Sequence, residues 1–290
     1  MLPTLEIQHD GPVATLWMNR PALHNAFNPS LIADLTAACR ELDADDAVRV
    51  VILAGRGKSF SAGADLNWMK AAGQASIEEN LEDARRLAVM LRTLAELRKP
   101  TIARVHGAAL GGGLGLAAAC DLCVAATGAV FATSEVRFGI IPATIGPYVI
   151  RAIGERQAFR YFQTAERIGA QRALEIGLVH EVVALEQLDA KIEELAHALL
   201  QGGPHALTAS KDLIRTMRGQ TMNDELMEDT ARRIAALRAT PEAREGLAAF
   251  LEKRSPAWIA PAPRVDVLPS PAGRGAGGEG LESPEHPQPE

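Results

Sequence analysis

The stretch Gly111-Gly-Gly-Leu-Gly115 is a glycine-rich loop that follows the apolar segment Pro100-Thr-Ile-Ala-Arg-Val-His106. A second loop of this kind, Ser61-Ala-Gly-Ala-Asp65, follows Val48-Arg-Val-Val-Ile-Leu-Ala54. In both places we expect a buried strand to lead into a helix, where backbone N–H groups can face a ligand. Glycine and alanine let the main chain approach a bound molecule closely. Two such donors directed at one oxygen would stabilise an oxyanion, so the loops predict one shared anion site.

Composition limits the classes of function that the chain can have. It has 290 residues, 47% of them hydrophobic, and a formal net charge of −6. The hydrophobic content is sufficient for a large core. Acidic and basic residues are interspersed, which predicts neither a nucleic-acid surface nor a polybasic membrane anchor. Because the first residues do not resemble a signal peptide and no run of 18 apolar residues occurs, we expect a cytoplasmic protein.

Other motifs that could bind metals or cofactors are incomplete. The pair Cys120 and Cys123 has the CxxC spacing, but no second pair or matching histidines accompany it, so we expect no metal site. The segment Gly113-Leu-Gly-Leu-Ala-Ala118 matches a dinucleotide-binding pattern, with Glu135 at roughly the distance of a ribose-binding acid. Two strand-like segments intervene before that acid, however, which argues against a dinucleotide fold.

The order of predicted elements indicates an α/β protein. A hairpin is expected over residues 5–18, and later strands over 48–54, 101–105, 121–126 and 130–132. Helices are expected over 28–43, 77–97 and 112–119. After about residue 184 only helices are expected, over 185–200, 204–218, 223–238 and 241–253.

Several further motifs occur along the chain, among them Met18-Asn-Arg-Pro21, Phe60-Ser-Ala-Gly-Ala-Asp-Leu66, His106-Gly-Ala-Ala-Leu-Gly-Gly-Gly113, Ala119-Cys-Asp121, Ser134-Glu135, Gly139-Ile-Ile-Pro142 and Phe250-Leu-Glu-Lys-Arg254. In this order they resemble the enoyl-CoA hydratase/isomerase (crotonase) superfamily over residues 4–258. The resemblance implies a ClpP-like spiral of ββα units over residues 1–195 and a C-terminal helical oligomerisation region over 196–258. The Pro/Gly-rich tail over 259–290 is expected to be disordered.

The same resemblance implies an acyl-CoA thioester substrate, with coenzyme A as part of the substrate and no separate cofactor. It implies homotrimers or dimers of trimers. The N–H groups of Ala62 and Gly112 would form the oxyanion hole for the thioester carbonyl. We expect a bulky substitution at Gly112 to abolish turnover with little loss of folding. Lys253 would reach a CoA phosphate across a subunit boundary, and the CoA path would be lined by Ala62, Gly63, Ala64, Asp65 and Leu66.

The number of carboxylates distinguishes reactions within the family. The well-known hydratases carry two glutamates, and this chain has Gly115 at the first position and Glu135 at the second. Syn hydration needs a base for water and an acid for the α-carbon, which a carboxyl pair supplies. With one carboxylate, Glu135 must act both as the base for water and as the acid for the α-carbon. Its helper is expected to be the distal carboxylate of the substrate, for which Arg137 is a possible cation.

Two groups of the superfamily fit a single glutamate. Residues 64–69, 134–143, 147–149 and 151–155 resemble most the bacterial methylglutaconyl-CoA and isohexenylglutaconyl-CoA hydratase-like proteins. This predicts hydration of a branched, carboxylated 2-enoyl-CoA. The alternative is a Δ3,Δ2-enoyl-CoA isomerase that uses Glu135 as its only base. A non-catalytic CoA-binding or scaffold homologue is a third interpretation, although the acidic charge balance argues against RNA binding.

Overall fold

The computed structural model describes residues 2–259, which lie in one compact unit. Apart from Ile259, the predicted tail over 259–290 lies outside the described residues. The predicted α/β class is confirmed by two mixed sheets covered by helices.

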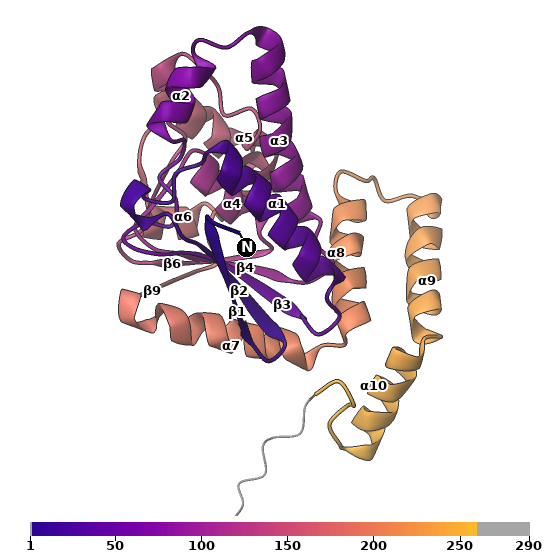
Figure 1. The fold of residues 1–290 in the computed structure, drawn as a ribbon. Helices are drawn as coiled ribbons and strands as arrows, with labels where there is room; N and C mark the ends of the chain where they lie inside the picture. Colours follow the sequence, from indigo (N-terminus) through magenta and orange to yellow (C-terminus); the bar gives the residue numbers. More distant parts are fainter. Residues whose placement is uncertain (1, 260–290) are drawn as a thin grey trace, which may run out of the picture. The chain divides into compact units, whose positions relative to one another are not determined.

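A six-stranded sheet forms the centre of the protein (Figure 1). Its order is β1-β2-β3-β4-β6-β9, and its strands are Leu5–Asp10, Val13–Met18, Val50–Gly55, Thr101–Val105, Leu122–Ala126 and Glu181–Val183. β1 and β2 form the predicted antiparallel hairpin, and every later neighbouring pair is parallel. All six residues of β3 are buried, as expected for a parallel strand covered on both faces.

A second sheet has three strands in the order β5-β7-β8. These strands are Ala108–Leu110, Val130–Ala132 and Ile168–Gly169. β5 and β7 are parallel, whereas β7 and β8 are antiparallel. An isolated parallel bridge also joins Ser61 to Ala109. This second sheet therefore connects the first glycine loop to the segment just before the second.

Helices cover the large sheet on both faces. The helices up to residue 175 are α1 (Pro29–Ala44), α2 (Leu66–Ala72), α3 (Ile77–Ala95), α4 (Gly112–Ala119), α5 (Gly146–Thr164) and α6 (Ala170–Glu175). Figure 1 shows α1 and α3 on one side of the strands and α7 (Leu188–Gln201) on the other. Ala196 of α7 packs with Leu188 and Ile192 against Val50 and other strand residues. The predicted boundary after residue 195 therefore falls inside a helix of the core.

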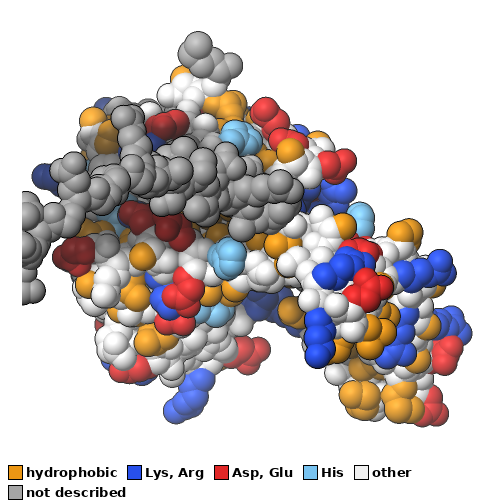
Figure 2. All heavy atoms as spheres, turned by 90° about the horizontal axis from the view of Figure 1, so that it is seen from below, with side chains coloured by type: hydrophobic (Ala, Val, Ile, Leu, Met, Phe, Trp, Pro, Cys, Tyr) orange, Lys and Arg blue, Asp and Glu red, His pale blue; other side chains and the backbone are white. Residues whose placement is uncertain are grey.

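The last three helices, α8 (Pro204–Met217), α9 (Asp224–Arg238) and α10 (Pro241–Glu252), lie to one side of the sheet (Figure 1). Among the described residues of these helices, Ala249 alone is buried. Polar contacts join α8 to the core, including an ion pair of 2.6 Å between Lys211 Nζ and Asp121 Oδ2. Figure 2 shows apolar side chains among the charged ones on this part of the surface. The exposed large apolar residues here are Leu213, Ile214, Met227, Ile234, Leu247, Phe250 and Leu251.

Candidate active site

The two glycine loops lie directly against each other. The N–H of Ser61 donates to Ala108 O at 3.0 Å, and the N–H of Leu110 donates to Ser61 O at 2.9 Å. The approach is closest at Gly113, where a Cβ atom would lie 2.3 Å from Ser61 O. Glycine is required there because any side chain would collide with this backbone oxygen. The structure thus brings together the two loops that the sequence predicted to share a site.

The hydrogen bonds of the first loop determine which N–H groups can receive a ligand. The N–H of Ala62 donates to His24 O at 2.9 Å, so it is already used within the protein. Phe27 pairs with Ala64 through the N–H of Asp65 and the carbonyl of Gly63. Neighbouring N–H groups of an extended segment point to opposite sides, so this pairing turns the Ala64 N–H away from Phe27. Ala64 N–H has no acceptor among residues 2–259.

The second loop supplies another unpaired donor. Gly112 is the first residue of α4, where a backbone N–H has no acceptor within the helix. No other acceptor for it occurs in the described part of the chain. The structure therefore does not support Ala62 as an oxyanion donor beside Gly112. In the first loop the N–H groups of Gly63 and Ala64 have no acceptor among residues 2–259, and that of Ala64, which the sequence had placed only along the CoA path, is the one turned away from Phe27.

Glu135 lies beside both loops. It opens a short 3-10 helix, Glu135–Phe138, and a Cβ atom at Gly111 would lie 3.2 Å from its Oε1 and 4.0 Å from Gly63 Cα. Its Oε2 is buried and has no hydrogen-bond partner among the described residues. Burial raises the pKa of the Glu135 carboxyl above its ordinary value of 4.5. A partly buried carboxyl group of this kind is suited to accept and return a proton near neutral pH.

Gly112 is tightly enclosed by the core. A Cβ atom there would lie 2.7 Å from Phe27 Cε2, and Phe27 is 1% exposed. The expectation that a bulky residue at Gly112 would leave folding intact is therefore wrong. A side chain at this position would push a buried ring out of place as well as obstruct the site.

Asp65 holds the first loop in place. Its carboxylate accepts the N–H of Asn67 at 2.9 Å, which caps α2, and pairs with Arg20 at 2.9 Å. The hydrogen bond from Arg20 lowers the pKa of Asp65. Leu66, the next residue, is 81% exposed. Asp65 is thus engaged in the protein's own structure, and the neighbouring Leu66 offers an apolar surface.

Apolar residues also follow Glu135. Phe138, Ile140 and Ile141 are exposed large hydrophobic side chains. Arg137, which directly precedes Phe138, is exposed and forms no ion pair within residues 2–259. The segment that directly follows Glu135 therefore exposes mainly apolar side chains, together with one guanidinium group that has no ion-pair partner among the described residues.

Lys253 is remote from the two loops in the same chain. It caps the C-terminus of α10 in a left-handed conformation, with a φ of 56°, and its side chain is exposed. Figure 1 shows α10 well away from α2 and α4, the helices that follow the two loops. A single chain therefore does not bring Lys253 to the site.

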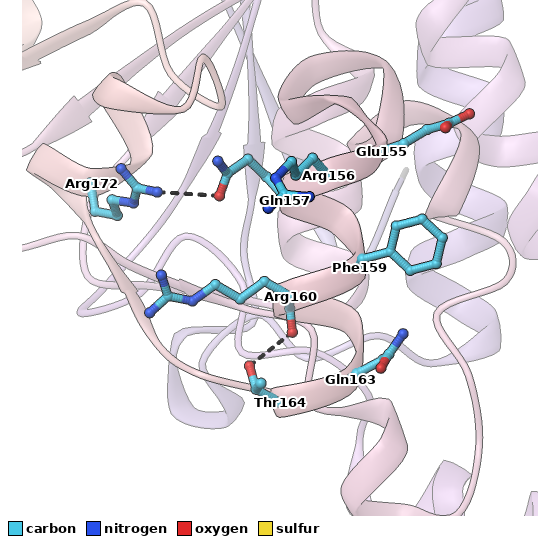
Figure 3. A pocket seen from close by; sticks show the side chains of 8 residues that line it. All are labelled: Glu155, Arg156, Gln157, Phe159, Arg160, Gln163, Thr164 and Arg172. Atoms are coloured by element: carbon cyan, nitrogen blue, oxygen red, sulfur yellow. Dashed lines mark hydrogen bonds between the residues drawn. The ribbon is translucent and has the colours of Figure 1, made fainter.

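A separate groove of about 720 Å³ lies along the second half of α5 (Figure 3). Two of its guanidinium groups are already bound: Arg160 pairs with Glu166 at 2.7 Å, and Arg172 donates to Gln157 at 3.2 Å. None of the glycine loops lines it. This groove is not part of the candidate site.

Neither a membrane span nor a metal site occurs among the described residues. No helix there is long and apolar enough to cross a membrane. No cluster of three or more His, Cys, Asp or Glu side chains in residues 2–259 has a metal-binding arrangement. The predicted cytoplasmic location stays a prediction.

Comparisons with known proteins show what the chain is similar to. The family model described as enoyl-CoA hydratase/isomerase matches residues 8–261. An enoyl-CoA hydratase structure from Shewanella pealeana is 40% identical, has a TM-score of 0.87, and the match covers 89% of this chain and 97% of that one.

Two curated relatives carry different names. A crotonyl-CoA hydratase of Syntrophomonas wolfei is 35% identical over 87% of this chain and 96% of its own length. A 4-chlorobenzoyl coenzyme A dehalogenase of an Arthrobacter species is 31% identical over 86% of this chain and 91% of its own length. Both names concern CoA thioesters but different reactions. With its crotonase fold and its family match over most of its length, the chain belongs to the enoyl-CoA hydratase/isomerase family.

Proposed function

We propose that this protein adds water to a 2-enoyl-CoA thioester by way of an enolate held by two backbone N–H groups. The observation that carries the proposal is the carboxyl group of Glu135 beside the loops of Ala64 and Gly112, since its buried Oε2 and both of these N–H groups have no partner among residues 2–259. The similarity to a relative named crotonyl-CoA hydratase supports hydration as the reaction.

The chemistry follows from where charge appears. When the oxygen of water attacks the β-carbon, electrons move onto the thioester oxygen, which accepts hydrogen bonds from Ala64 and Gly112. Loss of one such donor typically costs about 3 kcal/mol of transition-state stabilisation. Glu135 takes one proton from the water and delivers a proton to the α-carbon. The net result is addition of H and OH across the double bond, and Glu135 returns to its ionised form.

For binding, we propose that Ala62, Gly63, Ala64, Asp65 and Leu66 line the path of the CoA moiety. Ala62 and Asp65 would do so by holding the loop through His24 and Arg20, and Leu66 through its exposed side chain. Lys253 would act on a neighbouring subunit, because in its own chain it lies away from the loops.

We further propose a trimer or a dimer of trimers built through the C-terminal helices. The exposed apolar residues of α8, α9 and α10 support this assembly, since such surfaces on a single chain usually become buried against a partner. The assembly would bring Lys253 of one subunit toward the site of another.

The finer proposal for the substrate is methylglutaconyl-CoA or a related branched, carboxylated enoyl-CoA. Its support is the sequence resemblance and the exposed guanidinium of Arg137, two residues after Glu135. The exposed apolar side chains of Phe138, Ile140 and Ile141 favour the apolar part of such a substrate.

A specific observation favours a second candidate, the Δ3,Δ2-enoyl-CoA isomerase. Gly115 is buried in α4 and has no acid to contribute, so Glu135 is the carboxylate available to the reacting carbons. Isomerisation needs only one base, which takes a proton from the α-carbon and returns it to the γ-carbon.

A panel of substrates distinguishes these reactions. Purified protein is assayed with crotonyl-CoA, methylglutaconyl-CoA and a straight-chain 3-enoyl-CoA, and products are identified by mass and chromatography. We expect hydration, with the highest kcat/KM for the carboxylated substrate. Double-bond migration without hydration would favour the isomerase, and binding without turnover would favour the non-catalytic alternative.

A further inference from the structure

The space beside Gly115, where a side chain would lie, is filled by the side chain of another residue. A Cβ atom at Gly115 would lie 2.3 Å from Ile145 Cγ2 and 2.8 Å from Ile145 Cβ. Even an alanine at position 115 would therefore collide with Ile145. The isoleucine occupies the space that any side chain at position 115 would need.

Ile145 is fixed in this place. It is 2% exposed and directly precedes α5, and its carbonyl accepts the N–H groups of Tyr148 and Val149, each at 3.1 Å. A β-branched side chain has few χ1 rotamers, so it has little freedom to move aside. Ile145 also has no atom that can transfer a proton.

Position 115 is close enough to the site for this exchange to affect the chemistry. The N–H of Gly115 donates to Gly111 O at 3.0 Å, so the two residues lie one helical turn apart. One turn rises about 5.4 Å, which is within the reach of a glutamate side chain. A Cβ atom at Gly111, in turn, would lie 3.2 Å from Glu135 Oε1.

We propose that Gly115 and Ile145 are a complementary pair in which Ile145 excludes a second carboxylate and restricts the site to chemistry with one carboxylate. This inference rests on the proposed function. Ile145 is then a specificity-determining residue: its methyl groups form an apolar wall that neither binds water nor donates a proton. Two coordinated substitutions would be needed to change the reaction. A side chain added at Gly115 alone collides with Ile145, and truncation of Ile145 alone leaves a void.

The test is a double-mutant cycle with the full chain. The variants are Gly115→Glu, Ile145→Gly and the combination, and Gly115→Ala with and without Ile145→Gly serves as the smaller pair if the glutamate variants do not fold. We expect Gly115→Glu and Gly115→Ala to lower the unfolding temperature, and Ile145→Gly to recover part of each loss. Ile153→Gly, which removes a buried isoleucine farther along α5, is the matched control and should recover nothing.

Activity supplies a readout that packing alone would not change. In the folded double variant the ratio of hydration to isomerisation should rise by roughly tenfold or more, since a positioned acid or base typically contributes about 100-fold or more. The pH profile of kcat/KM should gain a second ionisation, because two neighbouring carboxyl groups titrate as a coupled pair.

Three results would overturn the inference: a wild-type unfolding temperature for Gly115→Ala, equal recovery by Ile153→Gly, or a folded double variant with the wild-type ratio and pH profile. A wild-type protein without hydratase or isomerase activity would instead contradict the proposed function. In that case the unfolding temperatures still decide whether Gly115 and Ile145 are sterically paired.

Discussion

At the scale of single residues, the burial that suits Glu135 to proton transfer also lowers the stability of the folded protein when its carboxyl group is ionised. Burial raises the pKa of its carboxyl above 4.5, so the folded protein binds this proton more tightly than the unfolded chain does. The stabilisation from the protonated form is fully present below the unfolded pKa and is lost as pH rises through the folded pKa. Ionisation of Glu135 therefore lowers the stability of the folded protein relative to the unfolded chain.

We expect Glu135→Gln to be more thermally stable than the wild type at neutral pH. The difference in unfolding temperature should shrink as pH falls toward 4.5, because the wild-type carboxyl becomes protonated there. Thermal unfolding across this pH range measures it. Glu193→Gln, which changes an exposed glutamate of α7, is the control and should show no such trend. A stability difference independent of pH would contradict the role of burial.

The donor in the first loop could be predicted from the sequence only to within a few residues. Glycine and alanine after a strand identified the loop, but the direction of each N–H depends on distant partners. The carbonyl of His24 accepts the N–H of Ala62. The pairing with Phe27 makes the N–H of Ala64 point away from Phe27. Likewise, the sequence showed that Gly115 lacks an acid, while only the packing showed that Ile145 fills its space.

At the scale of elements, the start of α2 connects stability to the site. Asp65 caps this helix, pairs with Arg20, and directly follows the N–H of Ala64. Loss of a helix cap typically costs about 1 kcal/mol, and loss of a mostly buried ion-pair partner adds to this. The loop that carries the donor should therefore lose order when Asp65 is truncated.

We expect Asp65→Ala to lower the free energy of unfolding by about 1–3 kcal/mol and to reduce kcat/KM. Asp65→Asn is the matched variant: asparagine still caps the helix, so its loss of stability should be smaller. Chemical denaturation and steady-state kinetics measure both effects. Wild-type stability and kinetics in Asp65→Ala would show that the cap and ion pair do not support the site.

Elements with strong local patterns were predictable, and those defined by pairing were not. The hairpin of β1 and β2 and the long helix α3 agree with the expected periodicity. The strands β5 and β8, with three and two residues, were not predicted, because so short a segment gives little pattern, although β7, also with three residues, was expected. Periodicity also could not show that α7 packs on the sheet, because an apolar helix face does not specify its partner.

At the scale of the whole molecule, the C-terminal helices leave a large apolar surface open in the single chain. Phe250 is 80% exposed and lies three residues before Lys253. A charge at this position would oppose burial against a partner. We expect Phe250→Glu to shift the protein toward the monomer in sedimentation velocity and to raise KM for acyl-CoA, since Lys253 would no longer reach a neighbouring site.

Phe159→Glu is the matched control for this substitution. Phe159 is 66% exposed but lies in the groove of α5, away from the C-terminal helices. Its variant should keep the wild-type assembly. A monomeric wild type, or a Phe250→Glu variant that sediments and turns over as the wild type does, would contradict the proposed assembly.

The central claim is that Glu135 is the single carboxylate that moves the proton beside two backbone donors. The most direct test is kcat/KM of Glu135→Gln with the best substrate of the panel, together with the affinity for a non-reactive acyl-CoA. We predict a fall in kcat/KM of about 100-fold or more, in line with the usual contribution of a general acid or base, with the acyl-CoA affinity unchanged. Turnover close to that of the wild type in a folded Glu135→Gln variant would contradict the account.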